Sequence, residues 1–310
     1  SAWTPALGEW THLALTYDGA NVITHRNGVV ENTYPQATGP IDAQTPSLKF
    51  GNIPSFSYAN VALDDVRVYN RALSAAEVSR LYLRGGGWQY RKKITIDKTK
   101  VGATLTDFPV LISRTDSDLQ GKAQASGNDI LFTAADGTKL SHEIEKYVSA
   151  TGELVAWVKV PSLSATANTD VYMYYGEAGA SDQQNKTSVW SNGYAGVWHL
   201  KEDPSGTAPQ MKDSTSNANH GTSAGVMTSG DQVAGKVGGS LDFDGCSGCG
   251  LDDLINAGSG SSLDDLGPLT YSAWIYPKSI GEGNFAKIIA KDTAGTVGLV
   301  QLALTHSNSA

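Results

Sequence analysis

The sequence has little charge of either sign and no long apolar run. Charged residues make up 17% of the 310 residues, and the formal net charge is −8. Lysine and arginine do not cluster, which disfavours nucleic-acid binding because phosphate neutralisation needs grouped cations. No run of about 18 apolar residues occurs, so no membrane-spanning helix is predicted. Hydrophobic residues are 40% of the chain, which is enough for the cores of about two ordinary domains.

Cysteine is also scarce, with only Cys246 and Cys249 in a C-x-x-C spacing. Zinc usually needs four ligands, and no second C-x-x-C pair is present to supply them. A thioredoxin-type site would need the motif to open a helix, whereas here it follows a predicted strand and lies among glycines. We therefore expect either a small disulfide-closed loop or two free thiols. A disulfide would suit an oxidising, extracellular location.

Enzyme motifs are nearly absent, since no phosphate-binding loop, dinucleotide fingerprint or Ser-His-Asp order occurs. The segment His142–Glu145 places Glu143 and Glu145 on one face of a predicted strand, about 7 Å apart. Glycosidases use two carboxylates at such separations. A solvated strand face explains the pair more simply, so we predict that the protein is not an enzyme. A glycan-acting enzyme is kept as a remote alternative.

Strand patterns dominate residues 1–86. Short segments rich in β-branched and aromatic residues alternate with Asp18-Gly19 and Asn27-Gly28 turns. The predicted strands are Leu13–Tyr17, Val22–His25, Leu48–Phe50 and Val66–Tyr69. Ser74 followed by Glu77 is typical of a capping box, so a short helix is predicted to begin there and to end at Gly85-Gly86-Gly87.

The rest of the chain also predicts strands. Residues 87–195 alternate in a way that predicts a β-sandwich of about 100 residues, with strands at Arg91–Ile96, Phe108–Ile112, Asp129–Thr133, Leu154–Val160 and Val171–Tyr175. Residues 196–310 predict strands between polar loops, at Gly196–Leu200, Ser240–Phe243, Leu269–Tyr276, Ala286–Lys291 and Gly298–Leu304.

Both ends of the chain resemble one domain family, in reversed order. The segments WTHLALTYDG (10–19) and LDDVRVYNRALS (63–74) resemble the second half of a laminin-G-like, or concanavalin A-like, jellyroll. The segments VWHL (197–200), DSTSNANHGT (213–222), LDFDG (241–245) and YSAWI (271–275) resemble the first half. Ser1 falls inside this jellyroll, so we expect the chain to be part of a longer protein.

The middle of the chain resembles a domain family of unknown function that often accompanies laminin-G-like domains in prokaryotic surface proteins. The matching segments are YRK (90–92), DFPVL (107–111), NDI (128–130), HEIE (142–145), WVKVP (157–161) and YYG (174–176). Together the resemblances imply an all-β fold. It consists of a concanavalin A-like jellyroll sandwich split between residues 1–86 and 196–310, plus an immunoglobulin-like β-sandwich at 87–195.

A half jellyroll cannot bury its inner face alone, so the two ends must either close on each other or each pair with a neighbour. We therefore expect a structural repeat unit of an extracellular or cell-surface protein, such as an adhesin or filament. Its partners would be neighbouring copies or repeats of the same protein. A module that binds carbohydrate or a host ligand is the alternative.

The resemblance also implies a calcium ion at the edge of the jellyroll, held by oxygen ligands. The residues that carry over are Asp64, Asp65, Asp213, Asn217 and Asn219. Alternatively, Asp64 or Asp65 pairs with Arg67, and the segment at 213–221 only forms turns.

Tryptophans could provide stacking platforms for sugars, although most fall inside alternating strands where core packing is expected. Trp3 and Trp190 lie in polar surroundings and are predicted to be the exposed ones.

Overall fold

The computed structural model describes residues 7–35, 48, 50–53, 57–58, 60–85, 87–244, 253–264, 267–278, 285–291 and 300–305. The described part is built mainly of short antiparallel strands, so the predicted all-β class is confirmed. Among these residues, no helix is long and apolar enough to cross a membrane.

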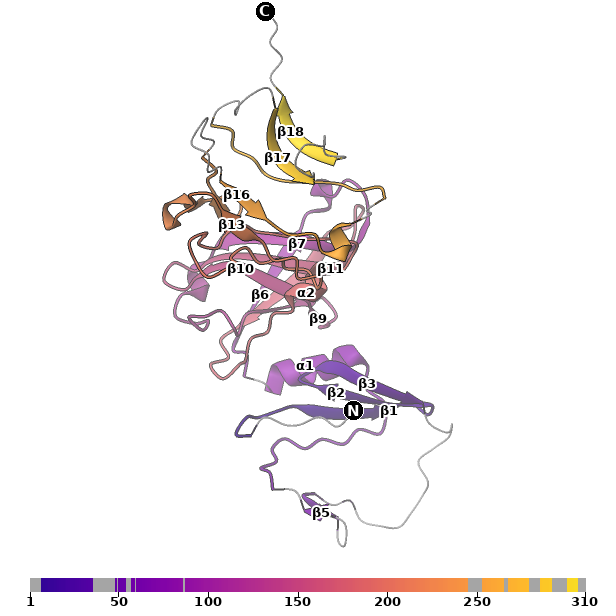
Figure 1. Ribbon diagram of the computed structural model, residues 1–310. Coiled ribbons are helices and arrows are strands. Elements are labelled where there is room, and N and C mark those ends of the chain that lie inside the picture. Colours follow the sequence, from indigo (N-terminus) through magenta and orange to yellow (C-terminus); the bar gives the residue numbers. More distant parts are fainter. Residues whose placement is uncertain are drawn as a thin grey trace, which may run out of the picture.

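A β-sandwich forms the middle of the molecule (Figure 1). One sheet has the order β10-β11-β7 and the other the order β6-β12-β8-β9. The strands are β6 (Tyr90–Ile96), β7 (Leu105–Thr115), β8 (Leu131–Ala134), β9 (Lys139–Leu140), β10 (His142–Val148), β11 (Glu153–Leu163) and β12 (Thr169–Tyr175). Two 3₁₀ turns lie at Lys98–Lys100 and Ser117–Leu119.

Alternation along these strands produces the core. Apolar side chains of both sheets meet in one buried cluster that includes Leu119, Phe132, Leu154, Val158 and Met173. The alternation in the sequence predicted most of this part of the fold: the five strands placed in residues 87–195 overlap β6, β7, β8, β11 and β12, whereas β9 was not predicted.

The N-terminal unit is a three-stranded sheet, β1 (Leu13–Tyr17), β2 (Asn21–Arg26) and β3 (Val29–Pro35), and a helix, α1 (Ala75–Gly85). Two short strands, β4 (Asn52–Ile53) and β5 (Ser57–Tyr58), pair with each other. The Asn27-Gly28 turn has φ angles of 48° and 78°, which suits the predicted hairpin.

Helix α1 begins with the predicted capping box. The backbone N–H of Ser74 donates to Glu77 Oε2 at 2.9 Å, and that of Glu77 donates to Ser74 Oγ at 3.3 Å. The helix contacts β3 and reaches the sandwich, where Ser79 Oγ donates to the carbonyl of Gly137 at 2.9 Å. Helix α1 therefore joins the N-terminal sheet to the sandwich.

The chain continues beyond the sandwich through α2 (Lys186–Val189) into short strand pairs. These are β13 (Thr222–Ala224) with β16 (Leu254–Asn256), β14 (Gln232–Ala234) with β15 (Gly239–Leu241), and β17 (Phe285–Lys291) with β18 (Val300–Thr305). Two further 3₁₀ turns lie at Ser229–Asp231 and Ser261–Leu263.

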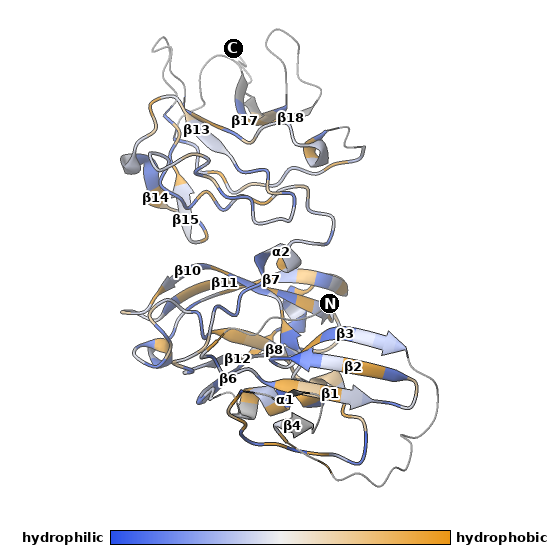
Figure 2. Ribbon diagram, turned by 60° about the horizontal axis from the view of Figure 1, so that its bottom comes forward, coloured by the Kyte–Doolittle hydropathy of each residue, from blue (hydrophilic) through white to orange (hydrophobic). Residues whose placement is uncertain are grey.

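The N-terminal unit and the described strands of residues 196–310, the two predicted jellyroll pieces, lie on opposite sides of the sandwich (Figure 1, Figure 2). No described sheet combines a strand of the N-terminal unit with a strand from residues 196–310. Closure of the two ends on each other is therefore not what this structure shows.

Three predicted strands do not pair into a sheet in the described part of the chain: Val66–Tyr69, Gly196–Leu200 and Leu269–Tyr276. Trp198 of the second segment forms only an isolated bridge to Asp213. The first and third expose large apolar side chains, with Val68 at 74% and Trp274 at 78% exposed. A strand needs a partner for its backbone groups and its apolar face, and neither segment has a strand partner among the residues that the structure describes.

Candidate functional site

The most distinctive polar cluster lies where residues 196–215 pack on the outer face of the β10-β11-β7 sheet. Glu143 and Glu145 of β10 point to this face, and His199 approaches from the opposite segment. The three side chains are nearly buried, with exposed fractions of 7%, 2% and 8%, respectively. Glu145 is the extra residue of a β-bulge, because the register with β11 shifts between Ile144 and Lys146.

The Glu143 carboxylate is fully hydrogen-bonded. Its Oε2 accepts from Trp190 Nε1 at 2.6 Å and lies 3.2 Å from His199 Nε2. Its Oε1 accepts from Ser214 Oγ at 2.6 Å. Every partner belongs to the segment that follows the sandwich strands, so this one carboxylate joins several parts of that segment to β10.

Glu145 completes the arrangement from the other side of the imidazole. Its Oε2 accepts from Trp157 Nε1 at 2.7 Å and lies 3.2 Å from His199 Nδ1. The ring of His199 stacks on Trp157 at a centroid distance of 6.1 Å and lies 5.7 Å from Trp190. Lys201 Nζ donates to the backbone carbonyl of Glu145 at 2.7 Å.

These contacts outweigh the cost of burial. Burial alone would lower the pKa of His199, but its hydrogen bonds to Glu143 and Glu145 and their charges raise it to about 9. Burial would raise the pKa of Glu143, but hydrogen bonds and the charge of His199 lower it to about 2. The pKa of Glu145 is lowered by the same contacts against burial. The cluster is therefore ionised across the neutral range.

The neighbouring His142 shows the opposite behaviour. It points into the sandwich, is fully buried beside Phe132, and neither of its ring nitrogens has a hydrogen-bond partner. Burial, with a smaller contribution from the charge of Lys139, lowers its pKa to about 4. Two buried histidines at the faces of one strand are thus held in different protonation states.

The prediction that Glu143 and Glu145 lie on a solvated strand face is wrong. Donors of the protein occupy both oxygens of Glu143 and Oε2 of Glu145, and the segment carrying His199 covers the two side chains. The two best-formed hollows among the described residues lie elsewhere. Sequence reasoning also missed His199, Ser214 and Lys201, because a histidine in an apolar VWHL segment gives no sign of a distant carboxylate partner.

The structure does not bring the residues of the predicted calcium site together. Asp64 and Asp65 are exposed in the N-terminal unit, where Asp65 pairs with Arg67 at 2.6 Å. Asp213, Asn217 and Asn219 lie in the loop after the sandwich. No group of three or more metal-ligating His, Cys, Asp or Glu side chains occurs among the described residues.

The Asp213 carboxylate does not suit a calcium ion, because its lone pairs already accept four hydrogen bonds. Oδ1 accepts from the N–H groups of Val197 and Thr215, at 3.0 and 2.9 Å. Oδ2 accepts from Thr215 Oγ1 and from the N–H of Asn219, at 2.8 and 2.9 Å. Asn217 and Asn219 donate their amides to the carbonyl of Ala195. The loop is organised by these bonds.

This geometry predicts that Asp213→Asn will destabilise the loop independently of calcium. An amide at this position sets N–H groups against N–H donors, so we expect a loss of about 1 to 3 kcal/mol in the free energy of unfolding. The measurement is thermal unfolding with added calcium and with chelator. A chelator-induced loss of stability in the wild-type protein that disappears in the variant would instead establish calcium binding at Asp213.

Of the predicted stacking residues, Trp190 is only 5% exposed and donates to Glu143, so its predicted exposure is wrong. Trp3, Cys246 and Cys249 lie outside the described residues.

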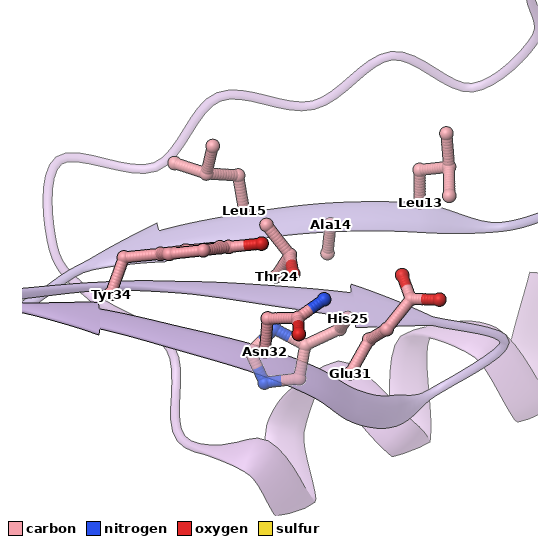
Figure 3. Close-up of a pocket in the computed structure, with 8 residues that line it drawn as sticks. All are labelled: Leu13, Ala14, Leu15, Thr24, His25, Glu31, Asn32 and Tyr34. Carbon is pink, nitrogen blue, oxygen red and sulfur yellow. The ribbon is translucent and has the colours of Figure 1, made fainter. Parts of the chain in front are cut away.

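A shallow hollow lies on the N-terminal sheet (Figure 3). Its volume is about 420 Å³, and its lining includes Leu13, Leu15, Asn32 and Tyr34. Leu13 and Leu15 are 58% and 66% exposed, whereas His25, which also borders the hollow, is buried. The sheet is therefore covered on the side of helix α1 and leaves apolar side chains uncovered on the other.

Comparison with known proteins identifies two parts of the chain. Residues 1–79 match a laminin-G family model described as the concanavalin A-like lectin/glucanases superfamily. Residues 126–207 match the domain of unknown function DUF2341. The chain is therefore similar to the concanavalin A-like superfamily in one part and to DUF2341 in another. The predicted resemblances are confirmed for residues 1–79 and 126–195, and the DUF2341 match continues beyond residue 195 to include His199 and Lys201. The resemblance of residues 196–310 to the first half of a jellyroll stays a prediction.

No curated protein matches the chain. One similar solved structure is an S-layer domain-containing protein (residues 221–444) from Clostridium thermocellum, with 25% sequence identity and a TM-score of 0.21. The similarity covers 26% of this chain and 43% of that one, so it spans less than half of the solved protein's length. The assignment to families rests on the two family models.

Proposed function

We propose that this chain is a structural unit of an extracellular surface protein, in which each half jellyroll is completed by the complementary half of a neighbouring unit. The observation that carries the proposal is the exposure of apolar side chains on two parts of the chain. These two parts lie on opposite sides of the sandwich (Figure 1). One is the β1-β2-β3 sheet with Val66–Tyr69, and the other is the unpaired segment Leu269–Tyr276.

Several features support a pairing role for these surfaces. Monomeric proteins rarely leave large apolar patches exposed, and an unpaired extended segment is suited to adding a strand to another sheet. Leu15, Val68, Trp274 and Tyr276 are each more than 60% exposed. Because the two surfaces differ and lie on opposite sides, repeated pairing would be head-to-tail and would extend into a filament. The concanavalin A-like match and its DUF2341 neighbour support a surface location.

A carbohydrate- or host-ligand-binding module is the second candidate. The hollow of Figure 3 favours it, since Tyr34 and Asn32 offer a ring and an amide beside apolar side chains. A glycan array and the variant Tyr34→Ala would distinguish the candidates. Glycan binding that Tyr34→Ala abolishes would support this second function. Catalysis is not proposed, because Glu143 and Glu145 are occupied by their partners.

The pairing proposal predicts a specific pattern of association, measurable by light scattering over a concentration series. The wild-type chain is expected to form a ladder of oligomers. Leu15→Asp removes one surface and Trp274→Asp the other, so each variant alone is expected to associate at least ten times more weakly. A mixture of the two retains one intact surface of each kind and is expected to form a capped 1:1 dimer.

The matched control is Val226→Asp, which places the same charge at a 56% exposed apolar residue outside both surfaces. It is expected to associate like the wild-type chain. A wild-type chain that stays monomeric at all concentrations, or equal loss in the control, would contradict the proposal.

A further inference from the structure

The geometry of His199 requires a charged ring. Both of its nitrogens lie 3.2 Å from carboxylate oxygens, Nε2 from Glu143 and Nδ1 from Glu145. Ionised carboxylates only accept hydrogen bonds, whereas a neutral imidazole carries hydrogen on one nitrogen alone. Both contacts are therefore satisfied only when the ring is an imidazolium.

Loss of that proton would leave one carboxylate facing a lone pair in a buried site. The other groups around the ring cannot replace the charge. Trp157 and Trp190 are neutral and already donate to the carboxylates, and Ser214 binds the far oxygen of Glu143. Lys201 reaches the backbone carbonyl of Glu145. Lys159, on the neighbouring strand, donates to Ser191 Oγ.

We propose that Glu143, His199 and Glu145 form a pH-sensitive lock, which holds residues 196–215 on the sandwich while the imidazole is charged and weakens when the ring loses its proton in alkaline solution. The lock sets the orientation of the segment that leads into the C-terminal jellyroll half. The contacts that form it lie within one chain, so the inference holds whether or not the jellyroll halves pair between units.

The sign of the pH dependence follows from the two shifted groups. The pKa of His199 is raised from 6.5 to about 9, so its stabilisation is complete below pH 6.5 and is lost as the pH rises through 9. The pKa of Glu143 is lowered from 4.5 to about 2, so its part is complete above pH 4.5 and is lost as the pH falls through 2. The two shifts describe one interaction and do not add.

The shift of His199 sets the expected size of the effect. Between pH 6 and pH 10, the equilibrium for docking residues 196–215 is expected to weaken by a factor of roughly 200. A simple surface histidine would change this equilibrium very little, and a neutral buried histidine would strengthen docking as the pH rises.

The test is an NMR titration of the full chain with labelled histidine rings, from pH 5 to pH 10.5. The ring that disappears in His199→Gln is expected to titrate near pH 9, and that of His142 to stay neutral throughout. In Glu145→Gln, which keeps the shape but removes one charge, the midpoint of His199 should fall clearly toward 6.5. A midpoint at or below 6.5 in the wild-type chain would overturn the proposal.

Thermal unfolding supplies an independent readout of the lock. The wild-type chain is expected to lose stability between pH 7 and pH 10, and His199→Gln should lose this dependence. The matched control is His220→Gln, which changes a histidine just beyond that segment, whose Nδ1 accepts from the N–H of Asp213. The control should keep the wild-type pH dependence. An equal dependence in wild type and His199→Gln would show that the triad does not act as a lock.

Discussion

Replacing Glu143 with leucine is expected to cost about 3 to 5 kcal/mol of the free energy that holds residues 196–215 on the sandwich. The substitution removes the only carboxylate shared by Trp190, Ser214 and His199. Three buried donors then lose their acceptor at once, and the imidazolium keeps one counter-charge in place of two. Removing one member of a buried ion pair is among the most damaging single changes, because the remaining charge stays desolvated.

The loss should appear as local release before global unfolding. The sandwich core does not include Glu143, so the strands around Phe132 and Leu154 are expected to stay folded. Amide hydrogen exchange is the suitable measurement, with faster exchange at residues 196–201 and 213–215. Glu143→Gln is the matched control, since its amide oxygen can still accept one hydrogen bond, and it should lose less. Unchanged exchange in Glu143→Leu would mean that the cluster contributes little to docking.

The strands of the sandwich could be predicted because the pattern that identifies each strand lies within a few consecutive residues. Alternation along segments such as Arg91–Ile96 and Val171–Tyr175 identifies a buried face without knowledge of the partner strand. The capping box at Ser74 and the Asn27-Gly28 turn are likewise decided within a few residues. These elements lie in the structure where the sequence placed them.

The predicted strands Val66–Tyr69 and Leu269–Tyr276 failed for a physical reason that also bears on function. Their composition favours a strand, but pairing requires another strand within reach, and the described part of this chain does not pair one with either segment. The amino-acid composition of a segment indicates the secondary structure that it would adopt in a complete domain, with a partner strand beside it. The observed lack of partners in the described residues is therefore an argument for completion from outside the unit.

The Glu143 cluster could not be predicted because its parts are distant in sequence. His199 and Glu143 are 56 residues apart, and Ser214 and Glu143 are 71 apart. A strand with two glutamates has a solvated face in most proteins, so the pattern alone indicates the wrong environment. The polar face of β10 is buried only because residues 196–215 fold back over it.

Gly152→Ala is expected to destabilise the sandwich by about 3 kcal/mol, because this glycine combines a left-handed backbone with a backbone contact. Its φ is +69°, and an added Cβ would lie 2.0 Å from the carbonyl oxygen of Asp116. The N–H of Asp116 in turn donates to the carbonyl of Gly152 at 3.0 Å. The two backbone segments therefore cannot move apart without losing that hydrogen bond. This approach holds the turn between β10 and β11 against the end of β7.

Gly121→Ala provides the matched control for this effect. Gly121 also has a left-handed backbone, with φ of +63°, but nothing lies within 4 Å of an added Cβ. It should therefore cost only the backbone strain of about 1 kcal/mol. Chemical denaturation of both variants separates strain from contact. Equal losses in the free energy of unfolding would mean that the backbone at Asp116 moves away to accommodate the added Cβ. The β10 edge that carries Glu143 would then be less firmly positioned than its hydrogen bonds indicate.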